Sequence, residues 1–304
     1  MSPLLCSNNK FNDSNEYNNI SEYKIIKQIG RGTFGQIFMV EKEKNEYFAL
    51  KKLIGCSMQE IHILEREYQI LFELNSSEET LDLVKIYKIE TKQLDPTTFV
   101  MYVLMELAQT DWEKEILNKK NTLNYYREEE LMNIMFSLIK TFAYLQKKNI
   151  SHRDIKPQNI LVFKDNKYKL ADFGEAKELI DENKITEGRT LRGTELYMSP
   201  ILFNALKSRQ IKKYIKHNTY KSDVFSFGLC LLFAATLCFE SLYEIRELKS
   251  NENIKIAVEK NLKERYSKHL INIIVNMLDI NENTRSDFID LEQKFFNFRK
   301  KDKS

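Results

Sequence analysis

The sequence predicts an α+β fold of two lobes, a small β-rich N-lobe with one main helix and a larger α-helical C-lobe. Residues Tyr23–Leu53 alternate apolar and polar side chains around a glycine cluster, which is typical of successive strands. After Ala108 the apolar residues recur mainly at helical spacing. A strand-rich first third followed by a helix-rich remainder indicates two segregated parts. We expect them to join near residues 106–109.

The composition is that of an ordinary globular protein, with 42% hydrophobic and 30% charged residues among 304. The formal net charge of +3 is close to balance, so nothing global favours nucleic acid or an anionic membrane. We therefore expect neither among the partners. Nothing in the sequence predicts the oligomeric state.

The N-terminus lacks the apolar segment of a signal peptide, and the four cysteines form no CxxC pair. We expect reduced thiols and a cytoplasmic protein, with a nuclear location also open. The sixteen uncharged residues Val224–Phe239 are fewer than the roughly 20 that cross a bilayer. They predict a buried helix instead.

Residues 1–20 are polar and rich in Asn and Ser, which predicts a flexible extension. We expect one domain over residues 21–299, with the N-lobe at 21–107, the C-lobe at 108–299 and a polar tail at 300–304. Apolar spacing predicts the main N-lobe helix at Gln59–Leu74. Further strands are predicted at Leu83–Glu90, Phe99–Leu107, Ile160–Phe163 and Tyr168–Leu170.

Three of the eight glycines fall in the stretch GRGTFGQI, at Gly30, Gly32 and Gly35. A GxGxxG pattern also marks dinucleotide-binding units, in which a helix follows the glycines. Here Gln36–Val40 continues as strand, which favours a hairpin whose backbone amides cover phosphates. A glycine-rich hairpin without a ligand is the alternative.

Lys51 ends the apolar strand FALK, and such a lysine acquires a function only where a carboxylate holds it. The helix Gln59–Leu74 contains four glutamates. Glu67 lies beside the inward apolar stripe of that helix and is the best candidate.

A charged loop, SHRDIKPQN at Ser151–Asn159, stands between a predicted helix and a buried strand, and Asp172-Phe173-Gly174 follows it. In order and spacing, GRGTFGQI, FALK, HRDIKPQN and DFG resemble the motifs of the eukaryotic protein kinase family. The resemblance covers about Tyr23 to Arg299 and implies the bilobal protein-kinase fold. Lys156 in KPQN resembles the serine/threonine branch.

The resemblance implies a phosphoryl-transfer site. Asp154 would accept or orient the proton of the substrate hydroxyl, and Lys156 would neutralise charge on the γ-phosphate. Lys51, held by Glu67, would contact the α- and β-phosphates. Such a reaction depends mainly on positioning and electrostatics, so cations, oxygen ligands and one base suffice.

ATP and Mg²⁺ are the implied cofactors, with Asn159 and Asp172 as the metal ligands. The resemblance assigns further contacts to ATP at Ile29, Gly30, Gly32, Gly35, Ile37, Ala49, Lys51, Met105, Glu106, Ala108 and Leu161. Asp111 would either reach the ribose or cap the helix that follows, and the sequence leaves both open.

Thr190 stands at a position that many relatives phosphorylate, and Arg153 beside Asp154 would receive that phosphate. This implies an upstream activating kinase as a partner. The alternative is an exposed threonine that is never modified. We expect His152 to be a packing residue and Asp223 to bond the backbone of the charged loop.

The sequence departs from the family at Ser199-Pro200-Ile201, where relatives have Ala-Pro-Glu and the glutamate pairs with an arginine. That arginine corresponds to Arg285, which must find another partner or become exposed. Phe225 replaces a frequent tryptophan. The basic stretch Lys207–Lys221 predicts either a solvated, mobile loop or a dock for acidic partners.

The predicted function is an ATP- and Mg²⁺-dependent serine/threonine protein kinase that acts on protein substrates. The alternative is a pseudokinase, a nucleotide-binding scaffold with weak or no catalysis. Retention of Lys51, Asp154, Asn159 and Asp172 argues for catalysis, and Ile201 is the one departure that favours the alternative.

Overall fold

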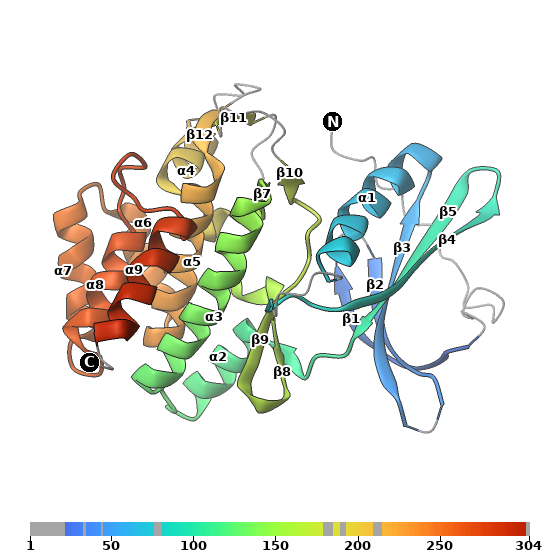
Figure 1. The fold of residues 1–304 in the computed structure, drawn as a ribbon, viewed down its shortest axis with the longest axis horizontal. Helices are drawn as coiled ribbons and strands as arrows, with labels where there is room; N and C mark the ends of the chain where they lie inside the picture. Colours follow the sequence, from blue (N-terminus) through green and yellow to red (C-terminus); the bar gives the residue numbers. More distant parts are fainter. Residues whose placement is uncertain are drawn as a thin grey trace. The chain divides into compact units, whose positions relative to one another are not determined.

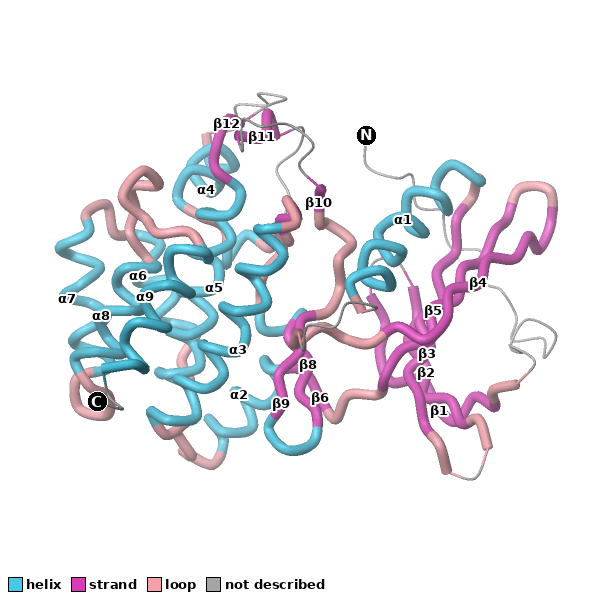
Figure 2. Tube along the Cα trace, viewed as in Figure 1, coloured by secondary structure: helices cyan, strands magenta, loops and turns pink. Residues whose placement is uncertain are grey.

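The computed structural model describes residues 22–32, 35–43, 45–75, 81–178, 185–188, 193–208 and 215–301. The chain divides into two compact units, residues 1–109 and 110–304. Strands dominate the first unit and helices the second (Figure 1, Figure 2), which confirms the predicted α+β fold. The predicted extension at 1–20 lies outside the described residues, and the predicted domain boundaries stay predictions.

The described residues of the first unit form one five-stranded antiparallel sheet and one helix. Its elements are β1 (Lys24–Gly32), β2 (Gly35–Glu41), β3 (Tyr47–Gly55), α1 (Met58–Leu74), β4 (Ile86–Asp95) and β5 (Thr98–Glu106). The strand order is β1-β2-β3-β5-β4. β1 and β2 form the predicted glycine-rich hairpin, in which Gly32 pairs with Gly35. A Cβ at Gly35 would stand 2.1 Å from the Lys52 carbonyl oxygen, so only glycine fits there.

Apolar side chains are buried on both faces of this sheet, since successive strand residues point to opposite sides. One face carries a buried cluster that includes Val100, Tyr102 and Leu104 of β5. The alternate residues Met101 and Val103 are also fully buried, on the face against which α1 packs. β5 is therefore apolar on both faces, and its bounds are close to those of the strand predicted at Phe99–Leu107.

Helix α1 begins where local hydrogen bonds satisfy its first backbone amides. The Ser57 hydroxyl accepts from the Glu60 amide at 3.2 Å, and the Glu60 carboxylate accepts from the Cys56 amide at 2.9 Å. This reciprocal pair fixes the chain as it leaves β3 and enters the helix.

The second unit is built around α5 (Thr219–Thr236), which is buried along nearly its whole length. The other helices are α2 (Trp112–Asn121), α3 (Glu128–Lys147), α4 (Pro200–Lys207), α6 (Phe239–Glu247), α7 (Asn251–Leu262), α8 (Lys268–Met277) and α9 (Phe288–Lys301). α3, α6, α7, α8 and α9 pack against α5 (Figure 1). The helix predicted from Val224–Phe239 is thus a core helix. Among the described residues, no helix has both the length and the apolar character needed to traverse a bilayer.

The second unit also contains short strands that pair with one another. They are β6 (Thr110–Asp111), β7 (Ile150–Ser151), β8 (Ile160–Phe163), β9 (Lys167–Leu170), β10 (Lys177–Glu178), β11 (Ile185–Gly188) and β12 (Ile215–Asn218). The sheets are β6-β8-β9, β7-β10 and β11-β12. 3₁₀ turns lie at Pro157–Asn159, Lys164–Asn166 and Glu195–Tyr197.

The expectation of a loop over Lys207–Lys221 is wrong for the end of that stretch. Residues 215–218 form β12, which pairs with β11, and α5 begins at Thr219. The Asn218 side chain caps α5 by accepting from the Lys221 amide at 3.1 Å. Charge density alone suggested solvent exposure, whereas the strand pairing involves residues far away in sequence. Residues 209–214 lie outside the described part.

Of the thiols expected to be reduced, Cys230 and Cys238 are free, and Cys6 lies outside the described residues.

Candidate active site

The charged loop Ser151–Asn159 is held in place by one buried carboxylate from α5. Asp223 is 4% exposed and accepts hydrogen bonds from the Ser151 hydroxyl at 2.8 Å and from the His152 and Arg153 amides at 2.9 and 3.0 Å. Burial raises the pKa of Asp223, and the three donors act in the opposite direction. The expectation that Asp223 bonds the loop backbone is confirmed.

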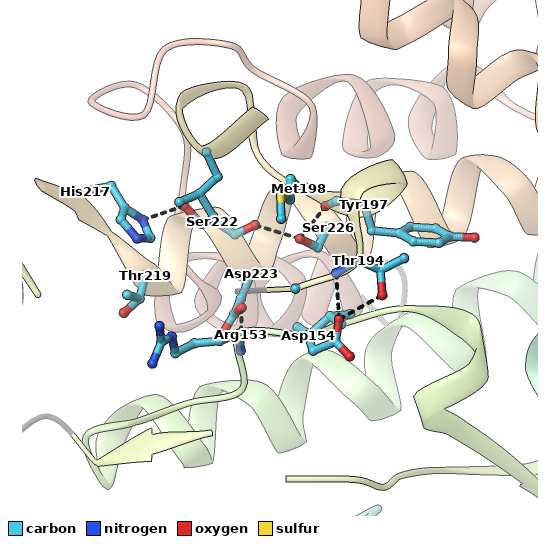
Figure 3. Close-up of a pocket in the computed structure, with 13 residues that line it drawn as sticks. Arg153, Asp154, Thr194, Tyr197, Met198, His217, Thr219, Ser222, Asp223 and Ser226 are labelled. Carbon is cyan, nitrogen blue, oxygen red and sulfur yellow. Dashed lines mark hydrogen bonds between the residues drawn. The ribbon is translucent and has the colours of Figure 1, made fainter. Parts of the chain in front are cut away.

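The backbone of this loop is unusual at Arg153, whose φ is +67°, in the left-handed region that few non-glycine residues adopt. The hydrogen bond from its amide to Asp223 stabilises that conformation. As a result Asp154, the next residue, turns toward Thr194 (Figure 3), whereas the Arg153 side chain extends away from it.

Asp154 is the centre of a polar cluster in the second unit. Its Oδ1 accepts from the Thr194 amide at 2.9 Å and from the Thr194 hydroxyl at 3.0 Å (Figure 3). Its Oδ2 lies 2.7 Å from Lys156 Nζ and accepts from Asn159 Nδ2 at 3.1 Å. The Lys156 ammonium group also donates to the Thr194 hydroxyl at 2.8 Å. The structure thus brings together three predicted site residues from one loop.

Thr194 is a member of this cluster that the motifs did not predict. It reaches Asp154 because Gly193 passes close to the loop backbone. Gly193 has a φ of +105°, and a Cβ there would stand 2.9 Å from the Arg153 carbonyl oxygen. The pair Gly193-Thr194 was the available signal, since a close backbone approach requires glycine.

His152 is a packing residue, as predicted. It is 1% exposed, and its ring meets the Phe173 ring edge to face with centroids 5.0 Å apart. Its Nε2 lies 3.1 Å from the Ala171 carbonyl oxygen, which can only accept, so Nε2 carries the hydrogen. Nδ1 is then the acceptor for the Asp154 amide at 3.4 Å.

The hairpin of β8 and β9 places the two predicted metal ligands at its open end. Ile160 pairs with Leu170, and the Ala171 amide donates to the Asn159 carbonyl at 2.8 Å, so Asn159 lies opposite the residue that precedes Asp172. The Asn159 Nδ2 group donates to the Asp154 carboxylate and carbonyl, which leaves its amide oxygen as the group for a cation.

These ligands fit Mg²⁺ bound together with phosphates. Within the described residues no group of three or more His, Cys, Asp or Glu side chains could hold a metal. One amide oxygen from Asn159 and the exposed carboxylate of Asp172 suit Mg²⁺, because that ion commonly takes one or two protein oxygens and completes its shell with phosphate and water.

In the first unit, strand register gathers predicted ATP contacts on one face of the sheet. Ile37 pairs with Lys51, and Ala49 pairs with Met105, so these four residues point to the same side. Gly30 pairs with Ile37 in the neighbouring strand. Of the other predicted contacts, Ile29 and Gly32 lie in β1, Gly35 in β2, Glu106 at the end of β5, Ala108 just after it, and Leu161 in β8 of the second unit.

Lys51 lies on the face of the sheet that α1 covers. Its Nζ is 5.3 Å from the centroid of the Tyr68 ring in α1. Glu67 precedes Tyr68 in that helix, but its side chain lies outside the described part of the structure. The pairing of Lys51 with Glu67 stays a prediction.

Comparison with known proteins decides the family. The sequence model described as "Protein kinase domain" matches residues 23–296, most of the chain. The chain belongs to the protein kinase family. It is 30% identical over 271 residues to "Calcium-dependent protein kinase 6" of Plasmodium berghei (strain Anka), covering 87% of this chain and 16% of that protein.

Two further relatives carry serine/threonine-protein kinase names. "Serine/threonine-protein kinase atg1" of Dictyostelium discoideum is 29% identical over 92% of this chain and 39% of its own length. "Serine/threonine-protein kinase Aurora-1" of Arabidopsis thaliana is 26% identical over 77% of this chain and 69% of its own length. The chain therefore spans well under half of the calcium-dependent and atg1 kinases that it matches.

Asp111 of this kinase domain is a helix cap. Its Oδ1 accepts from the Lys114 amide at 2.9 Å, and its Oδ2 lies 2.8 Å from Lys114 Nζ. Of the two predictions for Asp111, the cap is confirmed and the ribose contact stays a prediction. Just before it, the Glu106 carboxylate accepts from the Lys85 amide at 2.7 Å, which fixes the end of β5.

Arg285 binds other partners in place of the glutamate that the kinase pattern has at the position of Ile201. It is 2% exposed and donates to the carbonyls of Asp279 at 2.7 Å, Lys221 at 2.7 Å and Ile280 at 3.3 Å. Its guanidinium also lies 4.9 Å from the centroid of the Phe225 ring. Burial lowers the pKa of Arg285 to about 10, so it remains charged at neutral pH. Of the two predicted outcomes, another partner or exposure, the first is correct.

The predicted regulatory pair is only partly described. Thr190 lies outside the described residues. Arg153 lines a cavity in the second unit together with His217 and Thr219 (Figure 3). Whether the Arg153 guanidinium receives a phosphate from Thr190 therefore stays a prediction.

Proposed function

We propose that this protein is an active kinase that uses ATP and Mg²⁺ to phosphorylate serine and threonine hydroxyls of protein substrates. The observation that carries the proposal is the cluster around Asp154, in which a carboxylate, the Lys156 ammonium group and the Asn159 amide meet within hydrogen-bonding distance. Phosphoryl transfer needs this set because it depends on positioning and on stabilising charge.

In the proposed reaction the Asp154 carboxylate orients the substrate hydroxyl and accepts its proton. Lys156 neutralises charge that develops on the transferred phosphoryl group. Asn159 and Asp172 hold Mg²⁺, which supplies neutralising charge to the phosphate oxygens when bound. Lys51, positioned by Glu67, contacts the α- and β-phosphates, and the predicted ATP contacts of the sequence analysis complete the nucleotide site.

A transfer assay tests this proposal. Purified protein is incubated with ATP labelled on the γ-phosphate, Mg²⁺ and a mixed peptide library that contains serine, threonine and tyrosine. We expect label in phosphoserine and phosphothreonine, and loss of transfer when EDTA removes the metal. Label confined to phosphotyrosine contradicts the substrate class, and absence of transfer with both Mg²⁺ and Mn²⁺ contradicts the function.

We further propose that phosphorylation of Thr190 by an upstream kinase raises activity, with Arg153 as the phosphate-binding residue. Protein made in a eukaryotic host is expected to carry phosphate on Thr190, and Thr190→Ala protein from the same host is expected to be at least about tenfold less active. Mass spectrometry measures the phosphate on Thr190, and the transfer assay measures the activities of the two proteins. Unmodified Thr190 in wild-type protein together with equal activities would refute regulation at this position.

The proposed partners are protein substrates and that upstream kinase. A cytoplasmic location and the lack of nucleic-acid and membrane partners stay predictions from the sequence.

A further inference from the structure

We infer that Arg246 of α6 is a positioning residue that fixes the Glu195–Tyr197 turn and thereby holds Thr194 against Asp154. The inference rests on the proposed kinase function, because its consequence for rate requires Asp154 to act in phosphoryl transfer.

Arg246 binds the backbone of this turn directly. Its Nε donates to the Leu196 carbonyl at 2.9 Å, and its Nη2 donates to the Leu196 and Glu195 carbonyls at 2.6 and 3.0 Å. The next carbonyl, that of Tyr197, accepts from the Ser226 hydroxyl of α5 at 2.7 Å. Side chains from two helices therefore hold three consecutive carbonyls.

The guanidinium is itself fixed by aromatic rings. It lies 4.7 Å from the ring centroid of Phe203 in α4 and 5.8 Å from that of Phe225 in α5. A planar fork that stacks on rings loses little further freedom when it forms hydrogen bonds. Burial lowers the pKa of Arg246 to about 10, so the side chain remains cationic at neutral pH. Arg246 is thus a rigid donor.

The turn that Arg246 holds leads directly into the catalytic cluster. Thr194 precedes it, and the Tyr197 amide donates back to the Thr194 carbonyl at 2.9 Å. On its other side, Thr194 donates both its amide and its hydroxyl to Asp154 Oδ1. A shift of the turn must therefore move Thr194 relative to Asp154 and Lys156.

This anchoring differs in chemistry from the glutamate–arginine pair that the family resemblance implies. The Ile201 side chain cannot accept a hydrogen bond, and Arg285 is engaged with the carbonyls of residues 221, 279 and 280. Arg246, in α6, supplies its cation to the carbonyls of residues 195 and 196, a few residues before Ile201. Phe225 lies next to both arginines, which links the two anchors through one ring.

The test compares Arg246→Ala and Arg246→Lys with wild type and with Arg265→Ala, in which an exposed arginine on the Tyr125 ring is removed. We expect Arg246→Ala to lower kcat with a saturating peptide on the order of 10- to 100-fold, since small misplacements of catalytic groups have effects of that size. The KM for ATP should stay within about twofold. Arg246→Lys should be intermediate, because an ammonium group lacks the planar fork.

Two measurements distinguish a role of Arg246 in positioning the turn from a role in the stability of the protein alone. Guanidinium ion at low millimolar concentration should raise the rate of Arg246→Ala protein more than sodium ion does, and should not raise that of wild type. Hydrogen exchange of the peptide that contains Thr194–Tyr197 should be faster in Arg246→Ala protein than in Arg265→Ala protein, and this readout does not depend on activity.

Wild-type kcat and unchanged exchange in the Arg246 variants would overturn the inference while leaving the kinase function intact. If Arg246→Ala does not fold, kcat and hydrogen exchange of Arg246→Lys protein decide the inference instead, since lysine retains the charge and a similar length. Inactive wild-type protein would contradict the proposed function, and the exchange comparison would still decide whether Arg246 holds the turn.

Discussion

Asp154→Asn protein is expected to keep its fold and to lose at least about 100-fold of its phosphotransfer rate, because general base catalysis commonly contributes that much. The substitution preserves shape and removes both the proton acceptor and the negative charge. It also places an amide where Lys156 and Asn159 now both interact with one carboxylate oxygen, Oδ2, at 2.7 and 3.1 Å. The positions of both partners in the active site should therefore change slightly as well.

Initial rates with labelled ATP and a peptide substrate measure this effect, with the KM for ATP recorded alongside. The matched control is Asp165→Asn, at an exposed turn where φ is +60°, which asparagine also tolerates. The control should retain the wild-type rate. A variant at Asp154 that is as active as the control would remove this residue from the chemistry, and transfer in neither wild type nor variant would favour the pseudokinase alternative.

Elements with a strong periodic signal were predictable from the sequence. The spacing over Gln59–Leu74 predicts α1 nearly to its ends, and the short run Ile160–Phe163 matches β8. The strand predicted at Leu83–Glu90 lies instead at Ile86–Asp95, where the chain pairs with β5. Boundaries depend on hydrogen bonds that the apolar pattern does not encode.

Elements that exist only through distant pairing were not predictable. β12 forms because residues 215–218 pair with 185–188, and neither segment has an apolar alternation of its own. The basic residues around β12 indicated a solvated loop, yet His217 within it is 6% exposed. Tertiary pairing here overrides local composition.

The same limit applies to the site. The motifs predicted Asp154, Lys156 and Asn159 together, because they lie within one loop. They did not predict the Thr194 contact, or that Arg285 and Arg246 both bind backbone carbonyls. A carbonyl is present at every residue, so an arginine that uses one as its partner leaves no pattern in the sequence.

Asp223→Ala protein is expected to be destabilised by about 3–5 kcal/mol, the range seen when one member of a buried charged network is removed. Three donors from the consecutive residues 151–153 lose their shared acceptor, the side chain of Asp223, which is only 4% exposed. The left-handed backbone at Arg153 loses the bond that stabilises it, so Asp154 should also lose its fixed position. Stability and kcat should fall together.

Urea denaturation measures the first effect, and kinetics at a temperature where the variant stays folded measure the second. Asp290→Ala is the matched control, because this exposed aspartate near the start of α9 has one long backbone contact, at 3.4 Å, and should contribute less than about 1 kcal/mol. Asp223→Asn should fall between the two, since it retains one oxygen acceptor and turns an amide toward the remaining donors. A loss for Asp223→Ala no larger than that of the control would mean that the loop is held by its other contacts. The most direct of these are the bonds from Thr194 to Asp154, and in that case the 194–197 turn, rather than α5, would determine where Asp154 lies.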